Sequence, residues 1–355
     1  MFGQRLRRAR DAAGMSMQDL ATKVDLSANA IKKYEHGTNM PGSENLLKLS
    51  KALGVRSEYF FRQSNVQLQK VEYRKRANTT KKLLKMVNGD VTEQAERWTE
   101  LLDLYPNSPI PDFALPDGLP LSVESPEDIE AIAELVRHKW ELGLNPISEM
   151  IDTLESKGVL IIRTSVESGS KVDGLAGTIG KTPVVVVSTH STGDRQRFTL
   201  AHELGHLVLH GRLAEGVKEE QACNHFAGAF LLPKSGVMQH LGNHRRYLEI
   251  KELDLLKHEF GISMQGVLFR AWQCSVISNS VFQNWCKTFS KKRYKAVEPG
   301  EAYPQEKTIL LEQLVYRALG EEYIGESKAA ELLSLSLSSF YKERMLGEIG
   351  ESTNQ

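Results

Sequence analysis

A histidine, a glutamate and a second histidine stand in the middle of this chain at the spacing of a zinc-binding helix. His202, Glu203 and His206 form the pattern H-E-x-x-H. We expect a helix here that begins with Asp194 as its N-cap and ends at Gly211. Residues four apart project from one face of a helix, so both imidazoles can hold one Zn²⁺ at about 2.0–2.1 Å. Glu203 can then take a proton from a water molecule on the metal.

The third protein ligand is expected from a second helix, over residues 218–232. A catalytic zinc takes three protein ligands and keeps one position open. Glu219 and Glu220 are adjacent, so they point about 100° apart and only one can face the metal. Asn224 follows Glu220 at i+4 and can accept a hydrogen bond from the far nitrogen of a ligating histidine, whereas the face of Glu219 continues into apolar residues. The predicted metal ligands are therefore His202, His206 and Glu220, and Asn224 is predicted to orient one of the two histidines by a hydrogen bond.

Other polar residues nearby have alternative roles. His210 could reach the face of the two histidines, but it better fits packing at the helix end. Cys223 could be a soft ligand or a redox trigger, although a small buried thiol is the commoner state. Arg195 and Arg197 either pair with nearby acids or hold a substrate carbonyl or carboxylate.

Two helices and a small mixed sheet are expected to position the metal helix. A stripe of Leu200, Leu204, Leu207 and Val208 should bury one side of the metal helix and leave the histidines on another. In chain order, the other elements are helices from Ser125 to about Leu142 and over 145–157, a strand at 158–162, a glycine-rich turn at 169–178 and a strand at 183–188.

This order of elements is that of zincins, and the segment from about Ile129 to Pro233 resembles the ImmA/IrrE metallopeptidase family. The resemblance rests on Trp140, on Asp173-Gly174 and on the run from Arg197 to His206. It also includes Glu220, Asn224 and Leu231-Leu232-Pro233. The resemblance implies a zinc endopeptidase of the kind known from regulators that act by cutting a repressor. In such an enzyme the strand 183–188 could pair with an extended substrate by β-augmentation.

The N-terminal quarter has the pattern of five short helices. Ser16 and Ser27 are expected to cap two of them, joined by a tight turn at Asp25-Leu26, and the second carries exposed basic residues. Over about residues 3–61 this segment resembles the phage-repressor-like (XRE) helix-turn-helix family. The matching residues are Leu20-Ala21, Ile31, Tyr34-Glu35, Gly37 and Pro41. The resemblance implies binding to double-stranded DNA through Asn29, Lys32 and Lys33, and it also allows a homodimer.

Charge supports an anionic partner for this end of the chain. The formal net charge is zero over 355 residues, yet residues 1–65 hold 11 Lys and Arg against 6 Asp and Glu. Residues 66–85 hold 7 basic residues against one acid. Three cysteines without C-x-x-C spacing indicate reduced thiols and a cytoplasmic protein. No apolar run approaches 18 residues, so no membrane span is expected.

The rest of the chain is predicted to connect and regulate these two parts. Residues 66–126 are interpreted as a basic helical linker that becomes proline-rich, with six of the twelve prolines between Leu104 and Pro126. From Tyr247 onward the pattern is helical, and the segments 255–272 and 327–341 look like small helix-turn-helix pairs. The predicted domains are 1–65, 66–126, 127–240 and 241–355, the last being a helical sensor, lid or dimerisation region.

The sequence therefore predicts an α+β protein that is predominantly helical. It has an N-terminal five-helix DNA-binding domain, a zincin-like domain with a small mixed sheet and a C-terminal helical region. The predicted function is a cytoplasmic transcriptional regulator that carries a zinc-dependent endopeptidase, which cleaves a repressor or another regulatory protein. The alternative is a DNA-binding regulator whose zinc domain only senses or scaffolds, without proteolysis.

Overall fold

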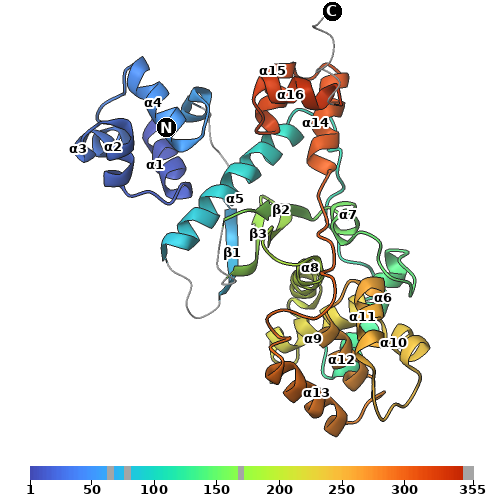
Figure 1. Cartoon of the computed structure of the whole chain (residues 1–355). Coiled ribbons are helices and arrows are strands. Elements are labelled where there is room, and N and C mark those ends of the chain that lie inside the picture. The colour runs from blue at the N-terminus through green and yellow to red at the C-terminus, as the bar shows by residue number, and fades with distance from the viewer. Residues whose placement is uncertain (62–67, 76–80, 167–171, 347–355) are drawn as a thin grey trace, which may run out of the picture.

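The computed structural model describes residues 1–61, 68–75, 81–166 and 172–346. Within these ranges the chain forms sixteen α-helices, one 3₁₀ helix and a single four-stranded sheet (Figure 1). The α+β class with a predominance of helix is therefore confirmed. None of these helices is long and apolar enough to span a bilayer, as far as the described residues go.

The N-terminal part is a five-helix domain with its own core. Its second and third helices begin where the sequence predicted, because the Ser16 hydroxyl accepts from the Asp19 amide and the Ser27 hydroxyl from the Ala30 amide. Asp25 adopts φ 56° and reverses the chain between them. The five elements are α1 (Phe2–Ala12), α2 (Met17–Val24), α3 (Ala28–Glu35), α4 (Ser43–Leu53) and the 3₁₀ helix η1 (Ser57–Phe61). Their shared core contains Leu6, Leu20, Ile31, Leu49 and Phe60.

The sheet is mixed and draws its edge strand from the predicted linker. Its spatial order is β1-β3-β4-β2, with β1 and β4 antiparallel to β3 and β2 parallel to β4. The strands are β1 (Leu68–Lys75), β2 (Leu160–Thr164), β3 (Val172–Ile179) and β4 (Thr182–Ser188). Two expectations were wrong. The glycine-rich segment 169–178 is largely strand β3, and β4 is an interior strand that has no free edge for a substrate.

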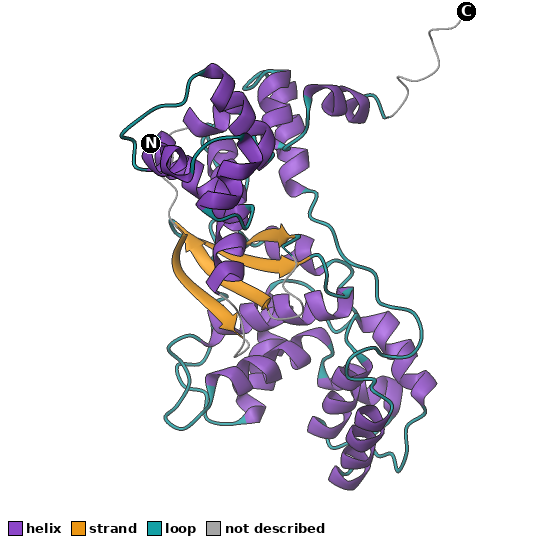
Figure 2. Cartoon of the chain, turned by 60° about the vertical axis from the view of Figure 1, so that its left-hand side comes forward, coloured by secondary structure: helices purple, strands orange, loops and turns teal. Residues whose placement is uncertain are grey.

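Both faces of the sheet are covered by helices, which Figure 2 shows on either side of the strands. Val185 and Val187 belong to the core that contains the metal helix α8 (Gly193–Leu209). Val184 and Val186 belong to a second core, which contains the long helix α5 (Lys81–Leu102). A strand buried on both faces carries no polar alternation, which explains the unbroken run of valines.

The half of the molecule that contains His202 and His206 is built from α8 and the helices around it. α6 (Pro126–Lys139) begins after Ser125, as expected, and Ser125 forms a capping box with Asp128. α7 (Met150–Glu155) is shorter than predicted, and α8 begins at Gly193 with Thr192, not Asp194, as its N-cap. The remaining helices here are α9 (Glu219–Leu231), α10 (Lys234–Leu241), α11 (Ile250–Phe260), α12 (Met264–Gln273) and α13 (Asn279–Lys291).

After α13 the chain returns along the body of the molecule to α5. We call residues 300–309 the return segment. It crosses the start of α8, where the Gly193 amide donates to the Tyr303 carbonyl at 3.1 Å. The last three helices then pack around the end of α5, away from α8 and α9 (Figure 1). They are α14 (Leu310–Gly320), α15 (Glu326–Leu332) and α16 (Leu337–Arg344).

Candidate metal centre

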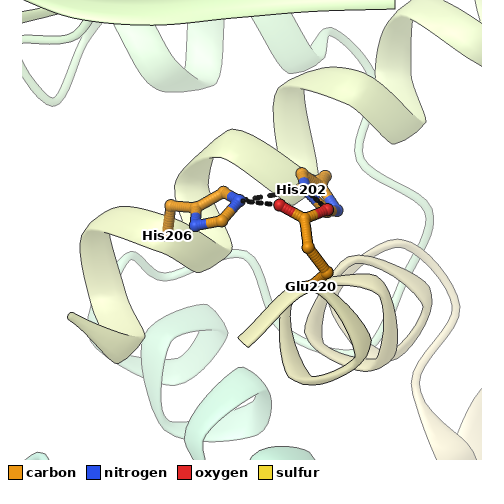
Figure 3. A group of neighbouring side chains, drawn as sticks. All are labelled: His202, His206 and Glu220. Atoms are coloured by element: carbon orange, nitrogen blue, oxygen red, sulfur yellow. Dashed lines mark hydrogen bonds and ion pairs between the residues drawn. The ribbon is translucent and has the colours of Figure 1, made fainter. Parts of the chain in front are cut away.

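Two histidines of α8 and one glutamate of α9 converge on a single point (Figure 3). The Nε2 atoms of His202 and His206 lie 3.1 Å apart. A Glu220 carboxylate oxygen lies 3.6 Å from Nε2 of His202, and its other oxygen lies 3.5 Å from Nε2 of His206. No other group of three or more potential ligand residues is found in the described part of the chain.

Each histidine is oriented by a partner on its far nitrogen. Nδ1 of His202 lies 3.0 Å from Oδ1 of Asn224, and Nδ1 of His206 lies 3.0 Å from Oε1 of Glu219. An amide carbonyl and a carboxylate can only accept, so each Nδ1 donates a proton to its partner. Both Nε2 atoms are then left with a lone pair directed at the convergence point. This is the arrangement that usually supports metal-binding histidines.

The role of Glu219 differs from the prediction made for it. The sequence placed its face against apolar packing, whereas its side chain is 53% exposed and bonded to His206. The signal was present, because two ligating histidines need two orienting partners and only Asn224 had been assigned to one.

A zinc ion fits this arrangement. Two nitrogen lone pairs and a carboxylate oxygen at these separations repel one another unless a cation lies between them. Tetrahedral bonds of about 2.0–2.1 Å place neighbouring ligand atoms roughly 3.3–3.4 Å apart, close to the three separations observed. A set of two imidazoles and one carboxylate is also typical of catalytic zinc sites.

Burial is uneven around the convergence point. His202 is fully buried and Glu203, its neighbour, is 5% exposed. His206 is 19% exposed and Glu220 is 64% exposed. One side of the site is therefore closed by protein, and the side of Glu220 is open to solvent.

Close packing of α8 on α9 brings the ligands together. A side chain at Gly205 would place its Cβ 3.2 Å from Cα of Cys223 and from the ring of Phe226. Gly205 therefore allows the two helices to approach closely. Cys223 is fully buried in this contact, and His210 is exposed at the end of α8 outside the ligand group.

Of the two roles that the sequence left open for Arg197, pairing with an acid is the one found. Arg197 is fully buried, forms an ion pair with Glu306 of the return segment and donates to the Ile147 carbonyl at 2.7 Å. Arg195 is half-buried and lines a cavity at the N-terminal end of α8, together with Phe198, Lys257 and Glu298.

The predicted DNA-contacting residues lie on the outer surface of the N-terminal domain. Asn29, Lys32 and Lys33 are all exposed on α3. The opposite side of the domain packs on the rest of the chain, where Arg5 and Arg8 of α1 pair with Glu96 of α5. α2 and α3 lie far from α5 in Figure 1, so the basic face of α3 remains accessible.

Two families match this chain. The helix-turn-helix family matches residues 6–60, and the family of IrrE N-terminal-like domains, peptidase family M78, matches residues 154–271. The second match contains the convergence point and extends into α12. It therefore runs beyond residue 240, where the sequence placed the end of the domain.

Curated helix-turn-helix transcriptional regulators are similar to part of this chain. The SPbeta prophage-derived HTH-type transcriptional regulator YonR of Bacillus subtilis is 31% identical over 94 residues, which is 26% of this chain and 84% of that protein. The HTH-type transcriptional regulator ImmR of Bacillus subtilis is 29% identical over 100 residues, 28% of this chain and 72% of that protein. The regulator y4wC of Sinorhizobium fredii is 39% identical over 59 residues, 17% of this chain and 41% of that protein.

A solved structure, ComR from Streptococcus suis, aligns over 98% of this chain and 94% of its own, at 13% identity and a TM-score of 0.16. A score this low carries no argument about the fold. The two family matches and the identity to YonR and ImmR are sufficient to assign the chain to a family. The chain belongs to the XRE-type helix-turn-helix transcriptional regulators and carries an IrrE/ImmA-like domain of peptidase family M78.

Proposed function

We propose that this regulator is a zinc-dependent endopeptidase that cleaves a repressor or another regulatory protein. The observation that carries the proposal is the convergence of His202, His206 and Glu220, whose imidazoles are already oriented by Asn224 and Glu219. Histidines that bind a metal almost always donate their other ring N–H to a partner of this kind.

We assign two roles to the residues of the site, metal binding and proton transfer. His202, His206 and Glu220 would hold the zinc ion, which supplies Lewis acidity toward a peptide carbonyl and toward water. Glu203 is buried beside His202 and would accept the proton of the attacking water. The same carboxyl would pass that proton to the departing amine, which is general base and then general acid catalysis.

The open side of the site supports access by a protein segment, because Glu220 is 64% exposed while the opposite side is closed. We also propose that the exposed residues Asn29, Lys32 and Lys33 contact double-stranded DNA. The chain would act in the cytoplasm, which fits the three free cysteines. Binding as a homodimer remains a prediction from the repressor-like domain.

The decisive experiment incubates the zinc-loaded chain with proteins encoded by adjacent genes and with itself. We expect cleavage that a chelator abolishes. Glu203→Gln keeps the shape of the side chain but accepts no proton at neutral pH, so this variant should retain zinc and DNA binding and cleave nothing. Cleavage by Glu203→Gln at the parent rate would overturn the mechanism. No cleavage by the parent chain would favour the rival function, a zinc domain that senses or scaffolds.

A further inference from the structure

The edge of the sheet beside the metal helix is occupied by a strand from outside the M78 domain. β1 lies at residues 68–75, whereas the family match begins at residue 154. It pairs antiparallel to β3, with Leu68 opposite Ile179 and Lys75 opposite Val172. β1 begins seven residues after Phe61, the end of the DNA-binding domain, so the connection between the two domains completes the sheet.

β3 is the strand whose outer edge borders the metal helix. Gly174 and Ala176 lie opposite Val187 and Val185 of β4, and directly opposed residues in an antiparallel pair share a face. Val185 and Val187 pack in the core of α8, so β3 presents the positions of Gly174 and Ala176 to the same side. β4 is paired with β3 and β2, whereas the outer edge of β3 is paired with β1 alone and would become a sheet edge if β1 left.

A peptidase needs its substrate in an extended conformation, and a sheet edge supplies backbone donors and acceptors for such a segment. If β1 left, the outer edge of β3 would expose a row of unpaired amides and carbonyls. The fit of β1 is irregular, because its register shifts between Gln69 and Glu72 and again between Tyr73 and Lys75. Two shifts within eight residues weaken the pairing of β1 with β3.

We propose that the outer edge of β3 is the peptide-binding surface of the M78 domain and that β1 occupies it in cis. The proposal rests on the proposed peptidase function in that it names the surface where the substrate lies. An extended peptide then binds only by replacing β1, a segment with three basic residues and one acid.

The first test measures peptide binding without catalysis, in the full chain carrying Glu203→Gln. The probe is a fluorescent peptide with the sequence of residues 66–77, followed by anisotropy. Gln69→Pro/Tyr73→Pro removes two backbone N–H groups from β1 and fixes φ at both positions, so it should disrupt the pairing with β3. The affinity for the peptide should then rise by tenfold or more, because the free edge becomes populated. Gln69→Ala/Tyr73→Ala is the matched control, since it shortens the same side chains and keeps both amides. Equal affinity in the proline variant and the parent would overturn the proposal.

A second test locks the strand in place. Glu72 lies opposite Ala176, so Glu72→Cys/Ala176→Cys should form a disulfide on mild oxidation and lose peptide binding until it is reduced. Thr178 lies opposite Gln69, so Glu72→Cys/Thr178→Cys is out of register and should not cross-link. Cys286→Ser in all variants removes the one cysteine that is not buried.

The proposal would also be overturned if Glu72→Cys/Ala176→Cys failed to cross-link, or if the cross-linked chain still bound the peptide. Neither measurement depends on proteolysis. A chain that shows both effects and yet cleaves no protein would contradict the peptidase function and leave the binding surface standing.

Discussion

Glu219 and His206 are joined by a hydrogen bond of 3.0 Å between Oε1 and Nδ1, while the adjacent Glu220 faces Nε2 of the same imidazole at 3.5 Å. Two neighbouring glutamates therefore face the two nitrogens of one imidazole, Glu219 at Nδ1 and Glu220 at Nε2. Together with Asn224 on His202, they leave neither histidine free to rotate.

This relationship predicts a graded loss of metal in three variants. Glu220→Ala should lose most of its zinc because a ligand is removed. Glu219→Ala and Asn224→Ala should each weaken zinc binding by about 10- to 100-fold, because orienting partners tune affinity without touching the metal. Competition with a chromophoric chelator measures all three. Zinc retained by Glu220→Ala but lost from Glu219→Ala would reverse the two roles.

The DNA-binding surface should respond to charge on α3. Lys32→Ala/Lys33→Ala should weaken DNA binding and lower the slope of log K against log salt by about 2, since each phosphate contact releases counterions. Zinc content should not change. Lys291→Ala/Lys292→Ala is the matched control, because it removes the same charge from exposed positions at the C-terminal end of α13. If both double variants reduce the slope equally, DNA does not bind at α3 specifically.

Glu155 makes the stability of the fold depend on pH. Burial raises the pKa of this carboxyl from 4.5 to about 8, although the Thr308 hydroxyl of the return segment donates to it at 2.6 Å. The folded state therefore holds a proton that the unfolded chain has released, and stability falls as pH rises from about 4.5 to about 8.

Glu155→Gln should remove that dependence. At pH 8 the variant should be more stable than the parent by at least about 1.4 kcal/mol, the equivalent of one pKa unit, and the difference should shrink toward pH 5. Urea unfolding at both pH values measures it. Glu215→Gln, at an exposed position, is the control and should leave the pH profile of the parent unchanged. A parent whose stability rises between pH 5 and pH 8 through this residue would contradict the burial argument.

Gly193 should be intolerant of any side chain. A Cβ at this position would lie 1.8 Å from the Pro304 carbonyl oxygen, which is backbone and cannot move aside alone. Gly193→Ala should therefore displace the return segment from α8 and lower the melting temperature. Gly320→Ala at the end of α14 meets nothing within 4 Å and should be close to neutral. Similar melting temperatures for the two variants would show that the return segment is not held at this crossing.

Local features of this protein could be predicted from the sequence alone. Helix starts at Ser16, Ser27 and Ser125 depend on contacts between residues three apart, and the turn at Asp25 depends on one backbone conformation. The shared face of His202 and His206 follows from helical periodicity. Glu220 and Asn224 were likewise selected by the spacing within one helix. Each of these features is decided by residues that are near neighbours in the chain.

Only the tertiary structure decided which distant segments meet. β1 pairs with β3 across about a hundred residues, and no periodicity in the segment 68–75 indicates its partner. The same segment reads as a charged linker because an edge strand tolerates basic residues. For Arg197 the sequence left open whether it pairs with an acid or holds substrate, and its partner Glu306 lies 109 residues away. The sheet edge and the return segment are set by which surfaces bury one another, and that depends on the whole chain folding at once.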